Sequence, residues 1–148
     1  MKDEHSVPEF ASMKLIPIRL QPGQDLRLAL ESWTEQEGEG SGWVVSGFGS
    51  LSGAQMRWAG RSDPTALHGD LEIVTLQGSL CRDGAHLHAT VADAQGSVLG
   101  GHLCVGSIVR TTAEILVAHL PQWQLERVAD PTTGYRELAI QPRLPRLP

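Results

Sequence analysis

The spacing of hydrophobic and polar residues predicts a strand and then a helix near the start of the chain. Residues 14–20 form a short segment with the apolar markers Leu15 and Ile18. Asp25 is a favourable N-cap residue, and we expect the helix that it opens to run to about Glu37. One buried helical face is indicated by apolar residues at the i, i+3, i+4, i+7 spacing, namely Leu26, Ala29, Leu30 and Trp33.

The rest of the chain has the pattern of β-strands. Strand 70–80 carries apolar residues on both sides, so we expect both of its faces to be covered. Sixteen glycines and frequent turn signals suit an antiparallel sheet. The predicted strands are 43–48, 53–59, 70–80, 85–92, 98–105 and 111–120, the later ones as a meander, with a last pair at 124–128 and 136–140. The predicted fold class is α+β: a single compact domain, mainly antiparallel sheet, with one principal helix.

The two ends differ in composition from the patterned middle. Residues 1–12 are polar and are expected to be a flexible extension, or to precede the true start if that is Met13 and not Met1. Residues 13–141 form the expected domain. Residues 142–148 form a proline-rich tail, which we expect to be extended.

Composition and charge narrow the class of protein. The chain has 148 residues, of which 41% are hydrophobic, enough for the core of one domain. It holds no run of about 18 apolar residues that could span a membrane, and residues 1–12 lack a signal peptide's apolar stretch, so we expect a cytoplasmic protein. The net charge of −5 argues against a nucleic-acid binder, although a local basic patch can coexist with an acidic total.

Three histidines carry the clearest chemical signal. His86 and His88 are two residues apart in a predicted strand and therefore share a face. The turn at 93–97 resembles a three-residue hairpin loop that pairs Asp93 with Ser97, which places His102 directly opposite His88. A slip of one residue in this register would send His102 to the other face.

Three imidazoles on one face could supply three ligands, at about 2.0–2.1 Å, to a divalent ion such as zinc. The fourth position would stay open, which is typical of catalytic zinc sites. The alternative is that the three side chains only hydrogen-bond to one another and to water. His68 and His119 have no such neighbours in the pattern, and we interpret them as structural or solvated, while His5 lies in the extension.

The two cysteines are expected to be free thiols that share the histidine face. The Asp83-Gly84 turn signal would pair Cys81 with His86, and the other hairpin would pair Cys104 with His86. The two thiols would then lie roughly 9–10 Å apart, too far for a disulfide. Each is either a further metal ligand or a small buried hydrophobic residue.

Six ordered segments together resemble the PPC family, the plants and prokaryotes conserved domain. The resemblance implies a compact fold built on an antiparallel sheet and assembled as a homotrimer. Its prokaryotic members carry HLH and GGH segments, the family's presumed metal-binding histidines, which correspond here to His86, His88 and His102. The matching segments are 19–26, 45–52, 71–78, 83–88, 100–103 and 111–114.

Members of this family are often described as candidate DNA-binding proteins. In plant members, DNA contact is attributed to a separate AT-hook with a basic Arg-Gly-Arg-Pro core, which this sequence lacks. Gln141-Pro142-Arg143 is not that motif, because it has no Gly-Arg core that could enter a minor groove.

Two glutamates in predicted strands match family positions, Glu72 and Glu114. Either could be a catalytic acid/base near the metal or a partner that orients a ligating histidine. The structural alternative is an ion pair with Arg57 or Arg110. The sequence leaves three functions open: a trimeric metalloprotein acting as a hydrolase or lyase on a small molecule, a regulatory module that binds DNA or protein, and a scaffold without chemistry. It names no substrate.

Overall fold

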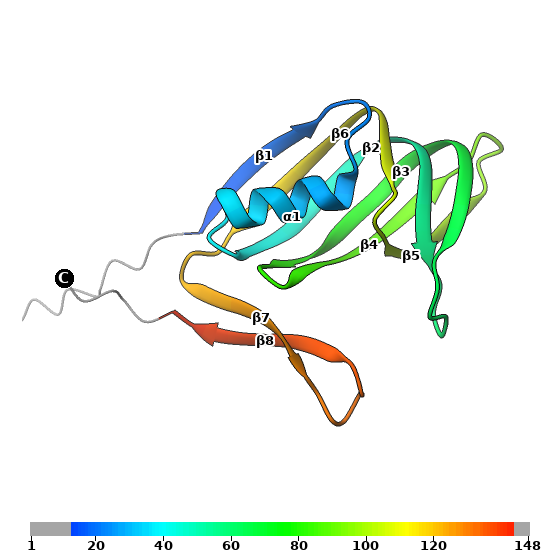
Figure 1. Ribbon diagram of the computed structural model, residues 1–148. Helices are drawn as coiled ribbons and strands as arrows, with labels where there is room; N and C mark the ends of the chain where they lie inside the picture. The colour runs from blue at the N-terminus through cyan, green and yellow to red at the C-terminus, as the bar shows by residue number, and fades with distance from the viewer. Residues whose placement is uncertain (1–12, 144–148) are drawn as a thin grey trace, which may run out of the picture.

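A computed structural model describes residues 13–143, so the expected extension 1–12 and residues 144–148 of the expected tail lie outside the described part. Over the described residues, the chain forms one helix, a six-stranded antiparallel sheet and a separate two-stranded hairpin (Figure 1). This confirms the predicted α+β class. In chain order the elements are β1 (Lys14–Leu20), α1 (Leu26–Gln36), β2 (Ser41–Arg57), β3 (Thr65–Cys81), β4 (Gly84–Ala92), β5 (Val98–Leu103), β6 (Ile108–His119), β7 (Trp123–Ala129) and β8 (Arg136–Pro142).

The strand order corrects the expected meander. The order is β1-β6-β2-β3-β4-β5, so β6 does not pair with β5 but lies between β1 and β2. After β5, the backbone amide of Cys104 donates to the Gln55 carbonyl at 2.9 Å and turns the chain along β2. The backbone amide of Leu26 donates to the Ser107 carbonyl at 2.9 Å and ties this connection to the start of α1. These are long-range contacts, which local patterning does not reveal.

Strand β2 is also longer than expected. The predicted strands 43–48 and 53–59 are one 17-residue strand, because the glycine-rich stretch between them bends at β-bulges without leaving the sheet. A bulge between Ile73 and Thr75 likewise interrupts the alternation of side chains between the two faces of β3. Leu71 and Ile73 are buried, but Val74 is 52% exposed. The expectation that both faces of this strand are covered is therefore wrong for the single chain.

The sheet curls until its last strand meets β2 again. Met56 pairs with Leu103 and Arg57 with His102, so β2, β3, β4 and β5 form a closed circuit of hydrogen-bonded neighbours. The closure needs Gly101, since a Cβ there would lie 2.7 Å from the Arg57 carbonyl oxygen. This close approach gives a physical reason for the glycine that precedes His102.

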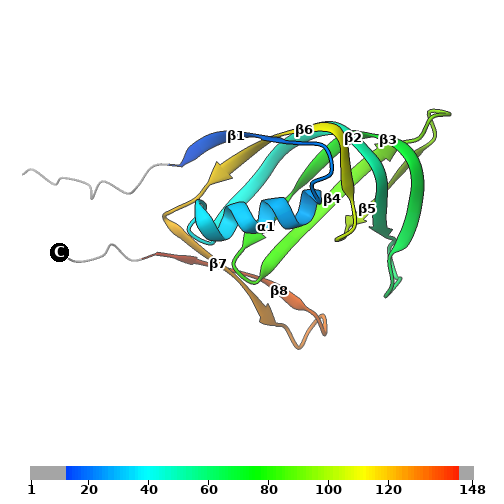
Figure 2. The same ribbon diagram turned by 45° about the horizontal axis from the view of Figure 1, so that its top comes forward.

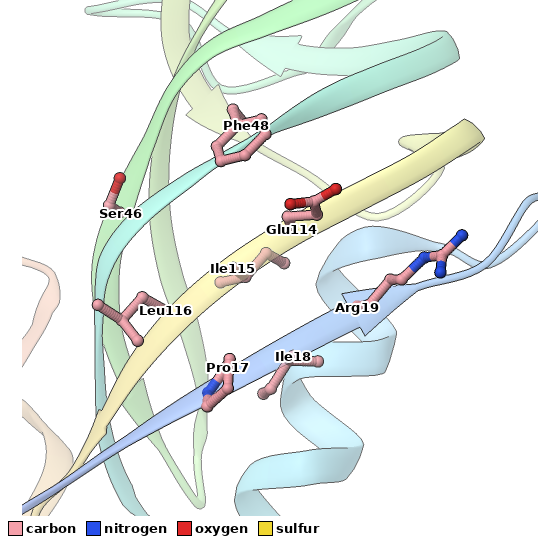
Figure 3. Close-up of a pocket in the computed structure, with 8 residues that line it drawn as sticks. All are labelled: Pro17, Ile18, Arg19, Ser46, Phe48, Glu114, Ile115 and Leu116. Atoms are coloured by element: carbon pink, nitrogen blue, oxygen red, sulfur yellow. The ribbon is translucent and has the colours of Figure 1, made fainter.

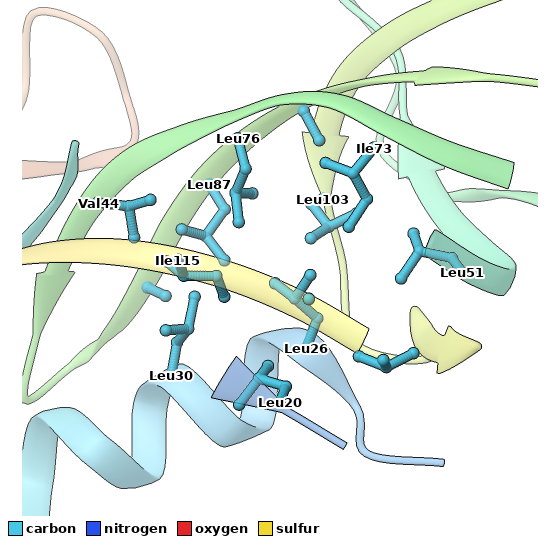
Figure 4. Close-up of a cluster of buried hydrophobic side chains, with 14 of the residues drawn as sticks. Leu20, Leu26, Leu30, Val44, Leu51, Ile73, Leu76, Leu87, Leu103 and Ile115 are labelled. Atoms are coloured by element: carbon cyan, nitrogen blue, oxygen red, sulfur yellow. The ribbon is translucent and has the colours of Figure 1, made fainter. Parts of the chain in front are cut away.

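The core lies between the sheet and α1, which runs along the inner face of the curved sheet (Figures 1 and 2). The predicted N-cap is confirmed, because the Oδ1 atom of Asp25 accepts from the backbone amide of Leu28 at 3.1 Å. Leu26 and Leu30 are fully buried against the sheet, while Ala29 of the predicted face is only half-buried (Figure 4). Within the described residues, no helix is long and apolar enough to cross a membrane.

Strands β7 and β8 form a hairpin that stands apart from the main sheet (Figures 1 and 2). Leu125 anchors it with 3% exposure, and its backbone amide donates to the Ser41 hydroxyl at 3.3 Å. Strand β8 includes Pro142, the first residue of the expected tail, and the Arg143 guanidinium contacts the Glu39 carboxylate at 3.2 Å. The hairpin also lies beside the end of β4 that carries the histidines, since residues from both line the same two hollows.

Candidate metal centre

The β4–β5 hairpin positions the three histidines as predicted. His88 lies directly opposite His102, and His86 is two residues along on β4. The turn fixes this register: the backbone amide of Asp93 donates to the Ser97 carbonyl at 3.0 Å. The Asp93 carboxylate in turn accepts from the amides of Gln95 and Ser97, each at 2.9 Å.

The imidazole nitrogens converge on one point. The Nε2 atom of His86 lies 3.1 Å from Nδ1 of His102 and 3.2 Å from Nε2 of His88. Around a tetrahedral ion with bonds of about 2.0–2.1 Å, two ligand nitrogens are about 3.3–3.4 Å apart. Among the described residues, this is the cluster of side chains that could hold a metal ion. The residues present therefore fit a small divalent cation.

Hydrogen bonding alone accounts less well for this arrangement. Nitrogen Nε2 of His86 approaches both other rings, but a neutral imidazole nitrogen offers either one proton or one in-plane lone pair. It can therefore serve one neighbour fully and the other only partly. A cation at the centre would accept one lone pair from each ring and so satisfy all three nitrogens.

Burial and positive neighbours disfavour protonation of two of the rings. The pKa of His102 is lowered to about 4, first by desolvation and then by the Arg57 guanidinium. The pKa of His86 is also lowered, by desolvation first and Arg127 second, while Glu137 acts in the opposite direction. At neutral pH both imidazoles are therefore uncharged, which is the form that binds metals.

Groups from other strands surround the cluster. Arg57 of β2 lies directly opposite His102, and Ser79 of β3 lies directly opposite His86. Nη2 of Arg127, from β7, donates to the Ser79 hydroxyl at 2.5 Å, so its guanidinium sits beside His86. Two hollows of about 360 and 520 Å³ adjoin this point, and His86, Arg127 and Glu137 line both.

Sequence reasoning missed Arg127 and Glu137. Both lie on the hairpin, far along the chain from the histidines. The sequence of β7 and β8 predicted strands but indicated no functional role. The alternation of β7 and β8 places Arg127 and Arg136 on the face of buried Leu125. An arginine on the buried side of a short strand is the signal that could have drawn attention to this position.

The cysteines are placed differently from the expectation. Cys81 pairs with Gly84 and not with His86, because the turn is centred on Arg82 and Asp83, one residue earlier than the Asp-Gly signal suggested. The buried Cys81 thiol donates to the Gly84 carbonyl at 3.1 Å, and burial raises its pKa. Both cysteines are free thiols, as expected, and neither joins the histidine cluster.

The structure does not bring Glu72 and Glu114 to the histidines. Both are exposed, and neither lines the two hollows beside the cluster. Glu114 lines a separate hollow of about 540 Å³ on the outer face of β1, β6 and β2, together with Phe48 and Arg19 (Figure 3). The alternative ion pair is also corrected, since Arg110 contacts Asp70 at 2.9 Å.

The other two described histidines are separate from the cluster. His68 is exposed on β3. His119 is buried edge-on to Trp33, with its Nε2 atom 4.0 Å from the Glu39 carboxylate. Their positions fit the interpretation of solvated and structural side chains.

Comparisons with known proteins place this geometry in a family. A model of the Plants and Prokaryotes Conserved domain matches residues 7–121, from before β1 to just after β6. A bifunctional protein GlmU from Synechococcus sp. is 50% identical over 131 residues, which is 88% of this chain and 21% of that protein. The chain thus spans about a fifth of the length of this curated relative.

Solved structures share the fold. A hypothetical protein from Salmonella is 36% identical, with a TM-score of 0.86 over 90% of this chain and 96% of that one. A metal-containing protein from Archaeoglobus fulgidus is 26% identical, with a TM-score of 0.75 over 85% and 93%. A candidate DNA-binding protein from Ralstonia eutropha is 27% identical, with a TM-score of 0.67 over 83% and 89%.

Proposed function

The chain belongs to the Plants and Prokaryotes Conserved domain family, and from this premise we propose that it binds one divalent metal ion through His86, His88 and His102. The observation that carries the proposal is the convergence of three ring nitrogens at 3.1 and 3.2 Å. The similarity to a protein described as metal-containing supports it.

Zinc is the metal that we propose, since three neutral imidazoles with an open fourth position are typical ligands of catalytic zinc. A bound zinc ion would polarise a small molecule or lower the pKa of a bound water at that position. Within the chain, Glu137 is the carboxylate best placed to exchange a proton there, because it acts electrostatically on His86 and lines both hollows. We therefore assign to Glu137 the acid/base role expected of Glu72 or Glu114, in a hydrolase or lyase acting on a small molecule.

Metal content tests the proposal. Elemental analysis of tag-free protein should find about one zinc or similar ion per chain. It should find none in the triple variant that carries His86→Ala, His88→Ala and His102→Ala. His68→Ala removes an exposed imidazole elsewhere on the fold and should keep the metal. Absence of metal in the wild-type protein, even after incubation with zinc, would overturn the proposal.

A DNA-binding or regulatory role is the second candidate. The naming of the Ralstonia relative as a candidate DNA-binding protein favours it. The net charge of −5 weighs against it, because duplex DNA selects proteins with a continuous basic face. We therefore rank it below the metal site.

We further propose that the protein assembles as a homotrimer in the cytoplasm. Large apolar side chains are exposed on the single chain, among them Val45 at 50% and Phe48 at 56%. Such a surface suits burial against further copies. The two free thiols are consistent with a reducing compartment.

A further inference from the structure

The larger hollow beside the histidines holds an excess of positive charge. Among the residues that line it are four arginines, Arg27, Arg57, Arg127 and Arg136, but only two carboxylates, Asp83 and Glu137. Arg27 is neutralised by Glu31 on its own helix, at 2.9 Å. Within residues 13–143, the other three arginines form no ion pair with a carboxylate.

Two of these arginines flank the histidines from opposite sides. Arg127 reaches His86 from the β7–β8 hairpin through its bond to Ser79, and Arg57 faces His102 across the β2–β5 pairing. Arg57 donates one bond from Nη1 to the Arg61 carbonyl, at 3.1 Å, and Arg127 one from Nη2 to Ser79. Since a guanidinium has five N–H donors, each arginine keeps several donors for a ligand.

The excess of positive charge in this hollow favours a negatively charged ligand. Imidazole binds a metal as a neutral ligand, so a divalent ion held by the three histidines would keep its full charge and add to that of the arginines. Closely placed positive charges that outnumber the neighbouring carboxylates repel one another, and a bound anion relieves this repulsion. The planar fork of arginine suits carboxylate and phosphate oxygens, which accept two parallel hydrogen bonds from it.

Resting on the proposed metal site, we propose that this hollow binds the carboxylate or phosphate group of a small acidic ligand, whose other end reaches the three histidines. The hollow of about 520 Å³ is of the size that small-molecule ligands occupy. Two of the arginines, Arg127 and Arg136, come from β7 and β8, beyond the segment 7–121 that the family model matches. The proposed acidic-ligand site thus requires the β7–β8 hairpin as well as the strands that carry the histidines.

Isothermal titration calorimetry of the full chain tests this assignment, with inorganic phosphate and malonate as separate probes. We expect at least one probe to bind, and Arg127→Gln and Arg57→Gln each to weaken its binding about tenfold, or about 1.4 kcal/mol, because each removes a charged hydrogen bond. Arg110→Gln removes a positive charge paired with Asp70 on another part of the sheet and should bind like the wild type. Arg127→Lys keeps the charge but loses the fork, and should show a partial loss.

The two probes and a metal measurement separate the outcomes. Binding of phosphate alone identifies a phosphorylated ligand, and binding of malonate alone identifies a carboxylic acid. Binding of neither probe, or equal binding by the wild type and both arginine variants with circular dichroism unchanged, would overturn the assignment. Arginine-dependent binding in protein that holds no zinc would uphold the acidic-ligand site and refute the metal proposal. Zinc retained without anion binding would do the reverse.

Discussion

Two physical effects lower the pKa of His102. Its ring is half-buried where β5 meets β2, and Arg57 lies directly across from it. Burial removes water that would stabilise an imidazolium, and the guanidinium repels one, so the pKa falls to about 4. The position therefore favours a ring that keeps its lone pair free for a cation other than a proton.

Acid should destabilise the metal-free protein through this residue. The unfolded chain protonates His102 near pH 6.5, whereas the folded chain does so only near pH 4. Between these values the unfolded state binds more protons, so the melting temperature falls as the pH is lowered. In scanning calorimetry, the melting temperature of His102→Asn should fall less than that of the wild type as the pH is lowered from 6.5 to about 4. The melting temperature of His68→Asn should follow the wild type. Parallel curves for wild type and His102→Asn would refute this account.

The strands that carry the histidines depend on one unusual contact between β3 and β4. Gly78 has φ +154°, and a Cβ there would lie 2.0 Å from the His86 carbonyl oxygen. Because that oxygen belongs to the backbone, the clash cannot be relieved by a rotamer change. The side chain of His86 is therefore positioned by a close approach that only glycine allows.

Gly78→Ala should cost about 2–4 kcal/mol of unfolding free energy and reduce metal content, since it combines backbone strain with a steric clash. Gly69→Ala is the matched control. Gly69 has φ +90° on the same strand but meets nothing within 4 Å, so it should cost only about 1 kcal/mol and keep the metal. Urea denaturation and elemental analysis measure the two effects, and equal losses in both variants would contradict the proposed role of the contact.

The sequence predictions were correct where an element depends on residues close together in the chain, and they failed where it depends on distant segments. The helix cap at Asp25 and the 93–97 turn are local signals, and they placed α1 and the opposition of His88 and His102 correctly. Pairings that depend on distant segments were missed: β6 beside β1, β5 against β2, and Arg127 beside His86. The Cys81 register failed because glycine follows the turn and does not occupy its centre.

The whole molecule has two unlike sides. The inner side of the sheet is filled by α1, whereas the outer side of β1, β6 and β2 carries the hollow lined by Pro17, Phe48 and Leu116 (Figure 3). Phe48 is 56% exposed there. We expect the proposed homotrimer to bury this outer side, because it combines apolar residues with a concave shape.

Phe48→Glu should convert the trimer to a monomer in sedimentation experiments while the metal content is kept, because a buried carboxylate would oppose association. Val98→Glu changes a side chain of similar exposure, 58%, at the start of β5 and should remain trimeric. Monomeric wild-type protein, or a Phe48→Glu variant that stays trimeric, would rule out this interface.

The hairpin that joins β4 to β5 has a consequence for the order of events during folding. His86, His88 and His102 lie within one short stretch of sequence, closed by the 93–97 turn. Such a hairpin forms in about 1–10 μs, well before long-range pairings such as β5 with β2 can close. The three histidines can therefore come together while Arg57 and Arg127 are still distant. A cation bound at that stage would favour the later pairing of β5 with β2. The two arginines would take their places beside the histidines last.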